Sequence, residues 1–188
     1  MHIVEAGLQG VLILTPQHHV DQRGVFSEVF REDVFTAAAG SVRLVQDNQT
    51  QSVRRSTLRG LHCQKPPRAQ GKLVRVTQGA ILDVAVDIRR GSPTFGRHVT
   101  MELSAENRKQ LWIPAGFLHG FCTLVDQTDV LYKVTDYYSP EHDTVVIWND
   151  PDLAIAWPEF DGGPILSEKD ALAPRLRDIE VAFIYGAE

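Results

Sequence analysis

The chain has 188 residues, a formal net charge of −5 and 43% hydrophobic residues. These values suit one domain over residues 1–188, and the negative charge argues against a general affinity for nucleic acid or anionic membranes. No apolar run approaches the ~20 residues of a membrane span. The start, MHIVEAGLQG, lacks the features of a secretory signal, and Cys63 and Cys122 form no recognisable framework. A reduced cytoplasmic protein without disulfides is therefore expected.

In chain order, short segments rich in β-branched residues alternate with Gly, Pro, Asn and Asp, which is typical of all-β proteins. The N-terminal part predicts strands at 10–16, 24–30 and 42–52, and a short helix at 32–40 that Gly40 closes. Further strands are predicted at 72–79, 80–89, 98–104, 110–116, 119–125 and 130–138. No helix of ten or more residues separates them, so an antiparallel sandwich or barrel is favoured. The tail predicts a short helix at 166–176 and a last apolar segment at 181–185.

The segment 80–89 carries carboxylates within an otherwise apolar strand. Asp83 and Asp87 share one face with Ile81 and Ala85, since side chains alternate along a strand. A small barrel with a polar interior usually holds a ligand. A half-exposed sheet with both aspartates in water fits the same pattern, so the sequence leaves the two readings open.

Metal, nucleophilic and nucleotide-cofactor chemistry are each disfavoured. A metal site in a β-barrel would want a pattern such as His-x-His, but here His62 is followed by Cys63 and Gln64, and glutamine is a poor ligand. His119 has no nearby partner in the sequence. Cys63 lies in no catalytic signature and is expected to be a small packed residue. The missing His-x-His pattern means that no metal is expected. The absence of GxSxG, P-loop and GxGxxG motifs means that no catalytic serine of that type and no nucleotide cofactor are expected.

The stretch STLRGLHCQKPPRAQGKLVRV, residues 56–76, concentrates cations around His62. Arginine suits bidentate contacts to phosphate, and lysine acts as a point charge. A solvated basic surface is the ordinary alternative, but Arg59 and His62 flank Gly60, and Lys72 opens an apolar strand. We therefore expect at least two cations of this region to line an anion-binding pocket. The candidates are Arg23, Arg59, Arg68, Lys72 and Arg75.

Four further side chains could serve proton transfer, each with an ordinary structural alternative. His62 and His119 titrate near neutral pH and could act as general bases, or be structural histidines of strands. Tyr132 could be a half-buried aromatic with a wet hydroxyl. Asp170 fits a helix capping box that begins at Ser167. Spacing alone does not bring these residues together.

Seven segments, in the same order, resemble the dTDP-4-dehydrorhamnose 3,5-epimerase family, metal-free members of the cupin superfamily. They are DQRGVFSEVF, VQDNQTQS, LRGLHCQKPPRAQGKLVRVTQGAILDVAVDIRRGSPTFG, LWIPAGFLHGFCTL, YKVTDYYSPEHD, WNDPDLAIAWP and LSEKD. The resemblance implies an all-β, cupin-type jelly-roll β-sandwich with a few short helices, acting as a homodimer. It also implies epimerisation at C3 and C5 of dTDP-4-dehydro-6-deoxy-D-glucose to dTDP-4-dehydro-L-rhamnose, without a cofactor.

The resemblance also implies residue roles. His62 matches the base, paired with Asp170; Tyr132 matches the acid on the opposite face, and Lys72 the group that stabilises the enolate oxygen. Arg23 and Arg59 match diphosphate ligands, and Phe26 and Glu28 the thymine-binding pair. In the family, part of the nucleotide site comes from the N-terminal strands of the partner subunit. The remaining substrate-binding matches are Gln46, Asn48, His119 with Asp83 holding it, Tyr138, Asp143 and Lys169.

One position departs from the family pattern, and two other functions compete with the double epimerisation. Asp143 stands where the family usually has a binding glutamate, one methylene longer, and Glu141 is a possible substitute. Some relatives in antibiotic-sugar pathways epimerise only C3 or only C5 and share nearly all these residues. A non-catalytic cupin that only binds a nucleotide sugar would not need the set of His62, Asp170 and Tyr132.

Overall fold

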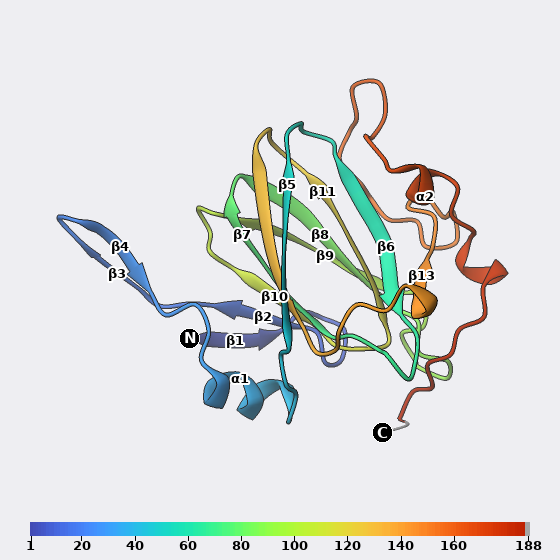
Figure 1. Cartoon of the computed structure of the whole chain (residues 1–188), viewed down its shortest axis with the longest axis horizontal. Helices are drawn as coiled ribbons and strands as arrows, with labels where there is room; N and C mark the ends of the chain where they lie inside the picture. The colour runs from blue at the N-terminus through green and yellow to red at the C-terminus, as the bar shows by residue number, and fades with distance from the viewer. Residues whose placement is uncertain (187–188) are drawn as a thin grey trace.

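The computed structural model describes residues 1–186, which fold mainly into two antiparallel sheets packed face to face (Figure 1). In spatial order, the six-stranded sheet consists of β1 (His2–Glu5), β2 (Leu12–Thr15), β10 (Gln110–Ile113), β7 (Lys72–Gln78), β12 (Thr128–Val134) and β5 (Gln46–Ser52). The five-stranded sheet consists of β13 (Asp143–Val145), β6 (Leu58–Gln64), β11 (Phe117–Thr123), β8 (Ala80–Asp87) and β9 (His98–Ser104). The expected all-β jelly-roll sandwich is confirmed.

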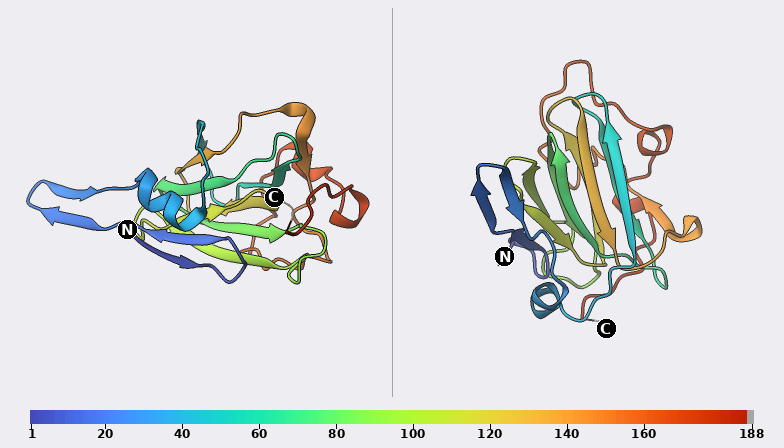
Figure 2. Two further views of the ribbon diagram at one scale, coloured as in Figure 1. Left: turned by 90° about the horizontal axis from the view of Figure 1, so that it is seen from below. Right: turned by 60° about the vertical axis from the view of Figure 1, so that its left-hand side comes forward.

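A separate hairpin of β3 (His18–Asp21) and β4 (Gly24–Ser27) projects from the body of the molecule (Figure 2). The helical segments are short: α1 (Glu32–Ala39), α2 (Glu168–Ala171), and the 3₁₀ turns η1 (Pro140–His142) and η2 (Leu176–Asp178). None of the helices within residues 1–186 has the length and apolar character to cross a membrane.

The predicted elements are present, with shifted ends. The expected helix at 32–40 is α1, and its Phe35 packs edge-on against Trp112 at 5.0 Å between ring centroids. The expected tail helix is only one turn, and Pro174, which cannot continue a helix, follows soon after its end. The strand expected at 24–30 ends at Ser27, and that expected at 42–52 begins at Gln46. The sequence pattern does not predict β1, β3, β6 or β13.

Both faces of the five-stranded sheet are covered, which answers the question raised by segment 80–89. Ile81 and Ala85 lie in the core between the two sheets. Val84 and Val86 point to the opposite face, where the C-terminal segment packs over them with Leu176 and Phe183 among the covering residues. Asp83 and Asp87 share the inner face and have no solvent exposure, so the half-exposed alternative is wrong.

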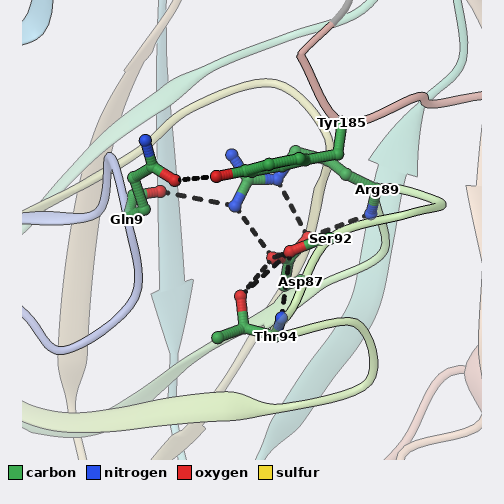
Figure 3. Close-up of polar contacts among 6 residues, drawn as sticks. All are labelled: Gln9, Asp87, Arg89, Ser92, Thr94 and Tyr185. Atoms are coloured by element: carbon green, nitrogen blue, oxygen red, sulfur yellow. Dashed lines mark hydrogen bonds and ion pairs between the residues drawn. The ribbon is translucent and has the colours of Figure 1, made fainter.

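The buried Asp87 carboxylate is surrounded by donors from the loop that follows β8 (Figure 3). Arg89 donates from Nε at 2.9 Å and Nη2 at 2.8 Å, Ser92 Oγ at 2.6 Å and Thr94 Oγ1 at 2.7 Å. The Arg89 guanidinium lies over the rings of Phe117 at 4.4 Å and Tyr185 at 5.2 Å. Burial would raise the pKa of Asp87, but these donors outweigh it and lower the pKa to about 2.

Tyr185 extends this cluster to the other end of the chain. Its hydroxyl donates to Gln9 Oε1, in the turn between β1 and β2, and its backbone N–H donates to the Arg90 carbonyl at 2.9 Å. Arg89 also donates to the Gln9 carbonyl at 3.4 Å. The cluster therefore joins the N-terminal turn, the end of β8 and the C-terminal segment that covers the sheet.

We expect this cluster to make stability pH-dependent in acid. Because the folded-state pKa of Asp87 lies below its unfolded value, its contribution is complete above about pH 4 and is lost as the pH falls towards 2. A pKa lowered from 3.8 to about 2 corresponds to roughly 2 kcal/mol. Denaturant unfolding at several pH values should show this slope in the wild type and a weaker slope in Asp87→Asn.

Asp33→Asn is the control for that measurement. Asp33 pairs with Arg31 on the exposed surface of α1, where solvent screens the pair. This variant should keep the acid slope of the wild type. Equal slopes in the wild type and in Asp87→Asn would show that Asp87 is not the group that titrates.

Candidate active site

A bulge in β6 places both Arg59 and His62 on the inner face of the sandwich. In a regular strand, residues three apart point to opposite faces. Here the register against β11 shifts, so that His62 lies opposite His119 while Arg59 lies opposite Phe121. Between these pairs, β6 has one residue more than β11. This extra residue turns the side chains of Arg59 and His62 to the same face, as β-bulges commonly do beside functional sites.

Gly60 makes this close approach of β6 to β11 possible. Its φ is +131°, and a Cβ on it would lie 2.5 Å from the Cα of Gly120, closer than two carbon atoms can pack. Gly60 is therefore needed for steric reasons, because a side chain there would push β6 and β11 apart. The sequence shows only that a glycine lies between Arg59 and His62.

Two adjoining pockets of about 390 Å³ and 270 Å³ lie beside His62. Both are lined by His62, Lys72, Tyr132 and Lys169. Further residues singled out in the sequence line the larger pocket, namely Arg59, His119 and Asp170. The smaller pocket adds Gln46, Asn48, Tyr138 and Asp143. The fold thus gathers residues from β5, β6, β7, β11, β12, β13 and α2 in one place.

His62 and Asp170 are paired directly. His62 Nε2 lies 2.6 Å from Asp170 Oδ1, and the Gly60 N–H donates to Oδ2 at 3.4 Å. Burial would raise the pKa of Asp170, but the hydrogen bond and charge of His62 lower it overall. Ser167 Oγ accepts from the Asp170 backbone N–H at 3.1 Å, so the predicted cap exists as well. The cap uses the backbone of Asp170 and leaves its carboxylate to the histidine.

Lys72 and His119 are polar groups buried beside this pair. Lys72 Nζ donates to the His62 carbonyl at 3.3 Å, and burial lowers the pKa of the ammonium. His119 Nε2 lies 2.6 Å from Asp83 Oδ1, as expected for a histidine held by Asp83. Burial lowers the pKa of His119, although the charge of Asp83 opposes the shift. Both cations are therefore easier to deprotonate than they would be in water.

Tyr132 lies on the wall of the pocket opposite His62. It lies on β12 of the six-stranded sheet, whereas His62 lies on β6 of the five-stranded sheet. Burial raises the pKa of the Tyr132 hydroxyl, so it is protonated at neutral pH. A substrate between the sheets would have an imidazole on one side and a phenol on the other.

Arg59 and Thr50 line the larger pocket, and each has a buried polar atom without a hydrogen-bond partner in the described part of the chain. Arg59 Nε and Thr50 Oγ1 are buried and have no hydrogen-bond partner among residues 1–186. Buried polar atoms are nearly always paired, so atoms of this kind indicate a ligand or ordered water. Arg68 and Arg75 lie elsewhere: Arg68 pairs with Asp136 at 3.2 Å, and Arg75 lines two other pockets, with Val29 and Gln110.

The hairpin residues Arg23 and Phe26, and Glu28 directly after the hairpin, do not line either pocket within one chain. Arg23 pairs with Asp21 at 2.6 Å, and 70% of Phe26 is exposed. Figure 1 shows the hairpin projecting on the opposite side of the molecule from α2. The other site residues implied by the resemblance line the two pockets, and these three stay apart from them.

Gln64 has a role that the sequence does not reveal. It is buried on β6, and its amide donates to the carbonyls of Arg68 at 2.7 Å and Tyr137 at 3.2 Å and accepts from Ser139 N–H at 2.7 Å. In the sequence it stands out only as a poor metal ligand.

No three His, Cys, Asp or Glu side chains of residues 1–186 gather into a metal-binding group. Cys63 is a free, buried residue, and burial raises its pKa to about 11.

Comparison with known proteins gives consistent matches. The family model described as dTDP-4-dehydrorhamnose 3,5-epimerase matches residues 5–178. A curated dTDP-4-dehydrorhamnose 3,5-epimerase of Sinorhizobium fredii is 50% identical over 185 residues, 98% of this chain and 94% of that protein. A Legionella pneumophila dTDP-6-deoxy-D-glucose-3,5-epimerase, in complex with dTDP-4-keto-L-rhamnose, has a TM-score of 0.94 at 44% identity and covers 99% of both chains. A 3'-monoepimerase from Streptomyces bikiniensis, in complex with dTDP-quinovose, has a TM-score of 0.87 at 37% identity, with 94% of this chain and 88% of that chain covered.

The steric role of Gly60 can be measured against Gly24. Both have similar positive φ values, +131° and +126°, but a Cβ on Gly24 would meet no atom within 4 Å. Gly24→Ala should cost ~1 kcal/mol through backbone strain alone. Gly60→Ala should cost ~3 kcal/mol or more, because the strands must also separate. Equal losses in denaturant unfolding would show that the contact with Gly120 does not matter.

Proposed function

The chain belongs to the dTDP-4-dehydrorhamnose 3,5-epimerase family, and from this premise we propose that His62, Lys72 and Tyr132 carry out the epimerisation. The observation that carries the proposal is the position of His62 and Tyr132 on facing sheets around one pocket. Epimerisation removes a proton from one face of a carbon and returns one to the other face. Two proton-transfer groups on opposite walls suit this inversion.

The chemistry follows from the ketone at C4 of the sugar. C3 and C5 are both α to it, so removal of either proton leaves an enolate. His62 takes the proton on Nδ1, because its Nε2 is engaged with Asp170. Asp170 orients the imidazole and stabilises its charged form. The electrons of the broken C–H bond move to O4.

Lys72 and Tyr132 complete the cycle. The negative charge on O4 favours the ammonium of Lys72, which burial alone disfavours. Tyr132 then donates its phenolic proton to the carbon from the opposite face, and the enolate electrons form the new C–H bond. Before the second carbon reacts, His62 releases its proton to solvent and Tyr132 takes one up from solvent. Repetition at the second carbon then gives the doubly inverted product.

The substrate is an anion that the net charge of the chain does not attract, so local cations must bind its diphosphate. Arg59, which lines the larger pocket and can contact phosphate oxygens with two N–H groups, suits this role. His119 contacts the sugar. Gln46, Asn48 and Tyr138 of the smaller pocket contact the nucleotide in the same proposal.

The proposal includes a homodimer in which the hairpin of one chain completes the site of the other. The hairpin presents apolar side chains to solvent, with Val20 71% and Phe26 70% exposed, which a partner surface would cover. Arg23 and Glu28 would then reach the nucleotide of the partner. A cytoplasmic location belongs to the same proposal, since both cysteines are free, as a reducing compartment requires.

Proton NMR in heavy water tests the reaction and the separate roles of His62 and Tyr132. The wild type should incorporate deuterium at both C3 and C5 with inversion, whereas a mono-epimerase would invert one carbon. His62→Ala should lose exchange at both carbons. Tyr132→Phe should keep its fold and binding, and should exchange hydrogen with retention faster than it forms inverted product. Efficient inversion by Tyr132→Phe would remove Tyr132 as the acid.

Mixing two inactive variants tests the shared site. In a dimer of Arg23→Ala with His62→Ala chains, one site receives an intact base from the first chain and an intact hairpin from the second. Refolding an equal mixture should restore up to about a quarter of the wild-type sites. Each variant refolded alone is the control. A mixture no more active than the mean of the two variants would show that each site is built from one chain.

A further inference from the structure

Asp143 lies at the centre of a series of contacts that begins and ends on β6. On β13 it pairs with Gln64 of β6, and Gln64 holds the segment 137–139 through Tyr137 O and Ser139 N. Within that segment, Tyr138 donates from its hydroxyl to Asp143 Oδ2 at 3.3 Å. The position of Asp143 is thus fixed by the strand that carries His62.

Asp143 in turn contacts the helix that carries Asp170. The same Oδ2 forms an ion pair with Lys169 Nζ. The Asp143 side chain is 13% exposed and that of Lys169 is 50% exposed, so the contact is partly shielded from water. Lys169 immediately precedes Asp170, and Asp170 contacts His62 on β6, which closes the series.

The helix α2 is too short to hold its own orientation. It spans four residues, and the helix-type bonds at this site run from Ala171 N–H to Ser167 O and from Leu172 N–H to Glu168 O. One helical turn is not stable without tertiary contacts. Adjacent residues of a helix point in directions about 100° apart. Asp170 against β6 and Lys169 against β13 therefore restrain the rotation of α2 from two sides.

We propose that Asp143 is a positioning residue for the catalytic base: its ion pair with Lys169 sets the rotation of α2 and so holds the Asp170 carboxylate against His62. This inference rests on the proposed roles of His62 and Asp170. It gives Asp143 a function within the protein at the position where a substrate-binding glutamate is expected.

Steady-state kinetics separate positioning from direct binding. Asp143→Asn removes the charge at nearly constant shape and should lower kcat about tenfold while KM stays within about twofold. Lys169→Met removes the cation and keeps the apolar stem. It should lower kcat by a similar factor, with KM again nearly unchanged. The double variant should be no slower than either single one, because both remove the same interaction. Asp143→Glu keeps the charge and should recover most of the kcat.

The matched control is Asp152→Asn. Asp152 and Arg177 form an aspartate–cation pair that is exposed on the surface, 3.9 Å apart and outside both pockets. This variant should keep wild-type kcat and KM. If Asp143→Asn fails to fold, Lys169→Met carries the test, since its side chain is half exposed.

Nitrogen-15 NMR of the imidazole provides a readout that does not depend on turnover. In the wild type, His62 should favour the Nε2–H tautomer that donates to Asp170; in Asp143→Asn and Lys169→Met that preference should weaken. A raised KM with unchanged kcat would make Asp143 a substrate ligand and overturn the proposal, as would additive losses in the double variant. An active His62→Ala would instead overturn the assigned base, whatever Asp143 does.

Discussion

The hydrogen bond between His62 and Asp170 is the contact on which the rest of the site depends. It joins residues 108 positions apart, one on a central strand and one on a single turn of helix. Each side needs its own support. The bulge at Gly60 turns His62 inward, and the Ser167 cap with the Asp143–Lys169 pair holds the helix. A free carboxylate at that depth would be costly, and pairing with the imidazole offsets the cost.

The space between the sheets is divided into an apolar part and a polar part. Leu111, Val130 and their neighbours fill the first, and their burial stabilises the sandwich. The second contains Lys72, His119 and Asp83, groups that a core ordinarily excludes. His119 Nε2 pairs with Asp83 Oδ1, whereas Asp83 Oδ2 has no hydrogen-bond partner among residues 1–186, and Lys72 donates only to a backbone carbonyl at 3.3 Å. That imbalance leaves the ammonium ready for an anionic partner, and the enolate oxygen of the proposed reaction would be one.

The sandwich architecture also explains how inversion can occur without movement of the sugar. Two sheets offer two walls, and each wall holds one of the two proposed proton-transfer groups at a fixed place in a strand register. His62 lies opposite His119 in one sheet, and Tyr132 lies between Val74 and Asn48 in the other. Strands are rigid supports, so the two groups keep their separation while the substrate changes from ketone to enolate and back.

The sequence by itself determined the class of fold and the family. Closely spaced strand segments from residue 72 to 138, without long helices between them, favoured an antiparallel sandwich or barrel, and seven long motifs identified the relatives. The capping box at Ser167 was also readable, because a cap is a local interaction. The roles assigned to His62, Lys72, Tyr132 and the binding residues remain predictions from the resemblance.

Only the tertiary structure decided which faces are covered and which distant residues meet. Alternation in segment 80–89 put Asp83 and Asp87 on one face, but whether that face meets water depends on the opposite sheet, which periodicity does not report. The contacts of Gln64, Asp143 and Lys169 escaped sequence reasoning for the same reason. They join β6, β13 and α2 through side chains whose spacing along the chain carries no signal. Local patterns follow from the geometry of one strand or one helical turn, whereas a site built across several elements follows from their packing.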